Sequence, residues 1–95
     1  MIVSITNVTT AVSTNVASSA TNVTLFSASS TDRGRSIFND STAVLYIKFG
    51  ATASTTSFKT QISAGALFEF PQPLYAGQVD GIWASASGFA RLTSW

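Results

Sequence analysis

The 95-residue chain contains no cysteine and no histidine. Without cysteine it can form neither a disulfide bond nor a thiolate metal site. Without histidine it lacks the side chain that most often acts as a general base or binds a metal. We therefore expect a protein that is not an enzyme and that holds no cofactor and no metal.

Charge is also scarce, with five basic and four acidic residues and a net charge of +1. This balance argues against nucleic-acid binding through a basic surface. No apolar run approaches the roughly 20 residues that a membrane-spanning helix needs, so we expect no membrane partner. The first residues carry no basic group ahead of their apolar side chains, and we expect no signal peptide.

Small hydroxyl side chains take the place of the missing charges, since 15 serines and 13 threonines make up 28 of the 95 residues. A soluble monomer normally relies on net charge for its solubility. Hydroxyl groups are less costly to remove from water than charged groups. The composition therefore favours a chain that packs against copies of itself or against a scaffold, and we expect a closed homo-oligomer, most simply a trimer.

Residues 1–24 differ in composition from residues 25–95, which we expect to form one compact β domain. The first segment holds no charge, glycine, proline or aromatic residue, and Thr-Asn-Val occurs in it three times. Its valines and isoleucines favour strands. They can form the first strand or two of the domain, or an extended arm that adds to the sheet edge of another subunit. The partner-contact candidates on such an arm are Val3, Ile5, Val8, Val12 and Val16.

The remaining chain predicts about seven short strands, because β-branched and aromatic runs are separated by turn signals every 8 to 12 residues. No window shows helical periodicity. This pattern is typical of a small antiparallel β-sandwich or barrel. Pro71 and Pro73 have no backbone N–H, so we expect them at a sheet edge or in a crossing between sheets. The expected strands are 23–28, 33–39, 44–49, 57–62, 66–70, 79–86 and 89–93.

Residues 36–50 are expected to form a hairpin near the centre of the domain. The cluster Asn-Asp-Ser-Thr at residues 39–42 favours a turn, because these side chains bond to their own backbone. Residues 44–49 are β-branched and aromatic, and Lys48 falls where the alternation places a solvent-facing side chain.

The ionisable side chains form no recognisable catalytic motif. Two carboxylates can carry out glycoside hydrolysis. The four acids, however, are scattered one to a turn or strand, and we interpret them as solvated loop and edge residues. A serine or threonine nucleophile needs an activating base. Without histidine only Lys48 or Lys59 could serve.

Arg33 and Arg35 flank Gly34 in a short basic stretch. The two arginines are candidates for contacting a partner. The alternative, which we favour, is a solvated edge at which they pair with Asp32 and Asp40. Gly34 between them is consistent with a bulge or with a close approach of another part of the chain.

Three aromatic residues, Tyr75, Trp83 and Trp95, could stack on a sugar or on a partner protein. Core packing is the interpretation we favour for each, and most firmly for Trp83, which lies between Ile82 and Ala84 in an expected strand. Trp95 is the last residue of the chain, and we expect it to be docked. Tyr75 and Trp95 are kept as partner-contact candidates.

Three stretches resemble a group of small virion proteins of tailed bacteriophages that are encoded among the head and tail genes. They are 39–50 (NDSTAVLYIKFG), 62–71 (ISAGALFEFP) and 75–88 (YAGQVDGIWASASG), within a likeness that covers about residues 33–94. A Ser/Thr-rich start is also typical of the group. The resemblance implies a structural virion component rather than an enzyme, and it carries over no functional residues.

Within that group, the leading hypothesis is a capsid decoration or cement protein, located on the virion and bound to the major capsid protein. The second hypothesis is a tail, neck or baseplate component of the same virion. A third, from another class, is a carbohydrate-binding β module that uses Tyr75 or Trp83.

Overall fold

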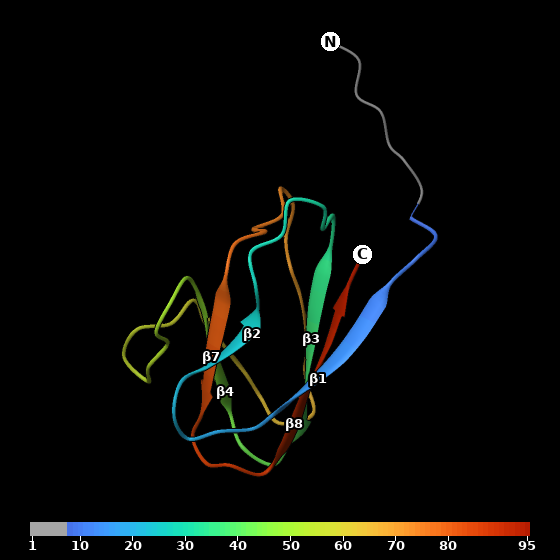
Figure 1. The fold of residues 1–95 in the computed structure, drawn as a ribbon. Coiled ribbons are helices and arrows are strands. Elements are labelled where there is room, and N and C mark those ends of the chain that lie inside the picture. The colour runs from blue at the N-terminus through green and yellow to red at the C-terminus, as the bar shows by residue number, and fades with distance from the viewer. Residues whose placement is uncertain (1–7) are drawn as a thin grey trace.

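Residues 8–95 are described by the computed structural model (Figure 1). This part of the chain forms eight strands and no helix. Two four-stranded antiparallel sheets, ordered β1-β8-β3-β6 and β2-β7-β4-β5, pack as an open sandwich around one core. The predicted all-β antiparallel sandwich is confirmed. The strands are β1 (Val12–Ala17), β2 (Val23–Phe26), β3 (Arg35–Ser41), β4 (Leu45–Phe49), β5 (Thr60–Ile62), β6 (Leu67–Glu69), β7 (Val79–Trp83) and β8 (Gly88–Ser94).

Seven of the strands overlap the segments expected from the sequence, and β1 is the eighth. β1 comes from the charge-free first segment. It pairs with β8 over its whole length, from Val12 opposite Ser94 to Ala17 opposite Phe89. In the structure, this part of the first segment is therefore a strand of the domain itself.

β3 and β4 do not form the predicted hairpin, because they belong to different sheets. The chain crosses between the sheets at residues 42–44. The buried side-chain amide of Asn39 donates to the carbonyls of Ala43 and Ile62, both at 2.8 Å. Ser41 Oγ donates to Asn39 Oδ1 at 2.7 Å. The turn-forming residues do bond locally, but they hold a corner between two sheets instead of a tight turn within one.

The core lies between the inward faces of the two sheets. Trp83 is 1% exposed, as predicted, and its Nε1 donates to Asn39 Oδ1 at 3.1 Å. The indole therefore joins the apolar core to the buried amide at the sheet corner. The other buried apolar side chains of this cluster are Leu25, Phe26, Ile37, Ala43, Leu45, Ile47, Ile62, Phe70, Val79, Ala90 and Leu92.

Arg35 is fully buried, so the solvated-edge interpretation is wrong for this residue. Arg33 is exposed as that interpretation expected, but Asp32 pairs with Arg35 and Asp40 with Arg91, so the predicted pairing of Arg33 is not found. The Nε atom of Arg35 pairs with Asp32 at 2.9 Å, and its guanidinium lies 4.7 Å from the centre of the Phe26 ring. The two terminal NH2 groups of the guanidinium donate to backbone carbonyl groups. They donate to the carbonyls of Ser27, Tyr75, Ala76 and Gly77.

Asp80 is the second buried charge, and its interpretation as a solvated acid is also wrong. Burial by itself would raise the pKa of this carboxyl, but hydrogen bonds to the ionised form outweigh it and lower the pKa below its ordinary value of 3.8. These bonds tie β2 and the loop after β4 onto the outer face of β7. The donors are Gln78 Nε2, Asn22 Nδ2, the backbone N–H of Thr52 and Thr24 Oγ1.

Pro71 and Pro73 lie in the exposed loop from β6 to β7, which crosses from the first sheet to the second, as predicted. The loop is held by aromatic stacking. The ring of Phe49 stacks on Tyr75 with centres 4.5 Å apart and on Phe70 with centres 5.2 Å apart.

Replacing Arg35 with methionine is expected to lower the free energy of unfolding by about 3–5 kcal/mol, because it leaves Asp32 and a set of backbone carbonyls without their donor. The matched control is R33M, at an exposed arginine two residues away. Urea unfolding of the control should differ from wild type by less than about 0.5 kcal/mol. Equal losses in the two variants would contradict the role assigned to Arg35.

Asp80 is expected to make the free energy of unfolding depend on pH in the acidic range. Its folded-state pKa lies below 3.8, so the carboxylate stabilises the fold above that pH, and the contribution is lost as the pH falls through the folded-state pKa. The measurement is the free energy of unfolding of wild type and D80N between pH 7 and pH 2. The difference between the two proteins should shrink as the pH falls, and parallel curves would contradict the prediction.

Candidate interaction surface

β1 forms an open edge of the first sheet. Within residues 8–95 it pairs only with β8. Ser18 N–H donates to the carbonyl of Gly88 at 2.9 Å, so the alternation of an antiparallel ladder directs the backbone groups of even-numbered residues toward β8. The N–H and C=O groups of Ser13, Asn15 and Ala17 therefore point outward, away from the sheet.

The edge of β1 has none of the usual protection against pairing with another strand. Natural edge strands are kept short or carry charge, proline or a bulge. β1 is six residues long, uncharged, without proline and paired regularly along its length. The other edges are shorter, since β5 and β6 have three residues each and β2 has four with a register shift. β1 is thus the edge best suited to accept a strand from outside.

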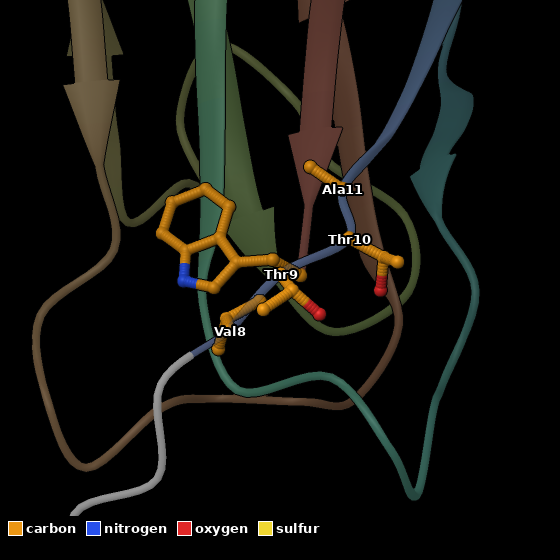
Figure 2. A pocket seen from close by; sticks show the side chains of 5 residues that line it. Val8, Thr9, Thr10 and Ala11 are labelled. Atoms are coloured by element: carbon orange, nitrogen blue, oxygen red, sulfur yellow. The ribbon is translucent and has the colours of Figure 1, made fainter.

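A groove lined by apolar side chains and two threonines adjoins the start of β1. It has a volume of about 360 Å³, is open to solvent, and is lined by residues 8–11 and Trp95 (Figure 2). Val8 is exposed at the groove, and Val12, 61% exposed, begins the adjoining strand. We call β1, residues 8–11 and Trp95 together the β1 edge surface. It contains no ionisable side chain, so it suits contact with protein better than acid–base chemistry.

Trp95 is docked, as expected, and Gly34 is the residue that permits it. The two residues exchange backbone hydrogen bonds, with both N–H groups donating at 3.0 Å. A Cβ atom on Gly34 would lie 2.1 Å from Cε2 of the indole, so any other residue would displace the ring. Because Trp95 is still 38% exposed, the docked ring presents part of its surface to the groove.

The partner-contact candidates from the sequence separate into three sets. Val8, Val12, Val16 and Trp95 belong to the β1 edge surface, with Val16 half-buried against the core, and exposed Arg33 lies beside it. Val3 and Ile5 lie outside the described residues. The structure places the last two candidates, Arg35 and Tyr75, in the interior network around the loop after β6.

The aromatic residues considered for sugar binding are engaged elsewhere. Trp83 is in the core, and one face of Tyr75 is covered by Phe49 while its hydroxyl donates to the carbonyl of Gln78 at 2.8 Å. Sequence reasoning missed a different set of exposed apolar residues on the outer face of the first sheet. These residues could have been found from the sequence, because each is next in its strand to a residue that is fully or partly buried. The set is Phe38, Leu67 and Phe89.

The described residues contain no group of three or more metal-binding side chains. Lys48 Nζ donates to Ser57 Oγ at 2.9 Å on the exposed surface, where the lysine supports the loop after β4. No helix in the described part of the chain could cross a membrane.

Comparison with protein-family models, with curated proteins and with solved structures found no match in any of the three.

Replacing Gly34 with alanine is expected to expel the Trp95 ring and to lower stability by about 1–3 kcal/mol, as overpacking does. Tryptophan emission should shift to longer wavelength and become more sensitive to iodide quenching, because Trp83 stays buried and Trp95 moves into water. The control is S36A, two residues further along, which adds no atom. Unchanged emission in G34A would contradict the docking of Trp95 on this glycine.

Proposed function

We propose that the protein is a non-enzymatic structural component of a bacteriophage virion, most directly a capsid decoration or cement protein that binds the major capsid protein and stabilises the head. The observation that carries the proposal is the β1 edge surface, where an unprotected strand edge lies beside an uncharged groove. Strand addition at the edge supplies backbone hydrogen bonds for association between copies, and the groove at Trp95 is the part of the surface that contacts a virion protein.

The resemblance to virion proteins supports the same function. Its stretches include the side chains that build the framework, such as the pair Asn39 and Trp83 and the 75–77 carbonyls around Arg35. β1 lies outside that likeness, in the Ser/Thr-rich start. The resemblance therefore bears on the framework, and the β1 edge surface supports the proposal on separate grounds.

The scarcity of exposed charge supports permanent assembly. Arg35 and Asp80 are buried, and Arg91 on the outer face of the first sheet is paired with Asp40 at 2.9 Å. A neutral surface rich in hydroxyl groups is removed from water at low cost. The protein accordingly assembles with copies of itself as well as with virion proteins. A position in the tail, neck or baseplate would use the same surface, and the location on the particle separates the two possibilities.

The first experiment is localisation on purified particles by labelling or image reconstruction. Density for this domain over the capsid supports a decoration protein, and density on a tail, neck or baseplate ring supports the second location. Absence of the protein from purified particles would overturn the proposal.

The second experiment measures rebinding to particles assembled without this protein. W95A should bind about tenfold more weakly than wild type, as expected for the loss of a central aromatic contact. The matched control is F58A, because Phe58 is 37% exposed and Trp95 38%, while Phe58 lies outside the β1 edge surface. Equal binding of the two variants would contradict the assignment of this surface.

A further inference from the structure

We propose that β1 pairs antiparallel with β1 of a second copy across a two-fold axis at Asn15, which joins two four-stranded sheets into one sheet of eight strands. This inference rests on the self-association in the proposed function and names the contact that makes it. The occupant of the open edge is thus a second copy of the same strand.

The hydrogen-bonding groups of the edge match themselves in this arrangement. The outward groups belong to Ser13, Asn15 and Ala17, at intervals of two residues and centred on Asn15. A two-fold axis at the centre places Asn15 opposite Asn15 of the partner subunit, and Ser13 opposite Ala17 of the partner subunit. Every outward N–H and C=O of the three residues then meets a complementary group, as antiparallel pairing requires.

Electrostatics favours a second copy as the occupant. β1 has no ionisable residue, so two copies bring no like charges together along the shared edge. The nearest charge on the neighbouring strand is Arg91, opposite Asn15, and its guanidinium is already paired with Asp40 at 2.9 Å. Side chains along the edge are small, and the amide of Asn15 can bond to its symmetry mate across the axis.

The same register buries apolar surface. Even-numbered residues of β1 face the inside of the sandwich, where Val16 packs against the core and Val12 is 61% exposed. The β1 strand of the second copy lies along the open edge and extends the sheet beside these residues. Two-fold pairing is also the commonest closed symmetry, and it leaves neither copy with a free β1 edge. It therefore predicts a dimer, where composition alone had favoured a trimer, and the mass in solution distinguishes the two.

The direct test uses the absence of cysteine from the chain. N15C should form a disulfide-linked dimer on mild oxidation, because the axis brings the two copies of position 15 within the Cα separation of about 4.4–6.8 Å that a disulfide needs. S13C alone should stay unlinked, because its two copies are offset by four residues, about 13 Å. A mixture of S13C and A17C should link. Failure of N15C to link, or equal linking of S13C, would overturn the register.

A second test needs no cysteine. S13K/A17K places lysines opposite each other across the interface, whereas S13K/A17D places a lysine opposite an aspartate at the same two positions. The dissociation constant of the dimer, measured by analytical ultracentrifugation, should be about tenfold or more higher for S13K/A17K, because opposed like charges destabilise paired strands. Equal constants, or a wild-type trimer or monomer, would overturn the inference.

These outcomes are separable from the proposed function. A protein found on virions whose N15C variant does not link would refute the two-fold pairing and leave the virion role standing. If N15C forms the linked dimer but the protein is absent from particles, the virion role is refuted and the two-fold pairing stands. Circular dichroism of each variant confirms that it is folded before its association is measured.

Discussion

The sandwich depends on one buried cation, the guanidinium of Arg35. It projects from β3 in the first sheet and donates to carbonyls that follow β2 and precede β7 in the second sheet. A buried charge is tolerated only when all of its hydrogen-bonding capacity is used. In the described part of the chain no buried side-chain polar atom lacks a partner. Gly34, immediately before this arginine, also receives Trp95, so the same end of the molecule organises the groove.

The position of Arg35 is part of a wider use of charge in this protein. Two of its nine charged side chains, Arg35 and Asp80, are in the interior, where each fixes loops to a sheet. Charges placed inside are not available to protect the surface or the sheet edges. β1 is left as a neutral edge of six residues beside an uncharged groove. The arrangement that stabilises a small core thus also leaves an uncharged strand edge at the surface.

Much of the fold follows from the sequence, because period-two alternation and turn residues are local signals. They predict the all-β class, seven of the eight strands, the buried Trp83 and the position of the prolines. The sheet to which each strand belongs is not a local property, which is why the hairpin of residues 36–50 was predicted wrongly. The burial of Arg35 is equally hidden, since most of its acceptors are backbone carbonyls about 40 residues away, and every residue has a carbonyl.

The candidate surface was predictable only in part. Val8, Val12 and Trp95 were identified from composition and position. The structure brings Val8 and Trp95 together at the groove and places Val12 at the start of the adjoining strand. That β1 is an edge strand depends on the strand order, for which the sequence holds no signal. The outward direction of particular backbone groups depends in turn on the register with β8. This register is what makes the proposed self-association a specific contact that can be tested.

The most direct measurement of the central claim is residue-resolved amide hydrogen exchange along β1. Inward-bonded amides such as Thr14 and Val16 are protected in any state, because they belong to the ladder with β8. The account predicts that the outward amides of Ser13, Asn15 and Ala17 are protected at high protein concentration and lose protection on dilution. Rapid exchange of these three amides at every concentration would contradict it.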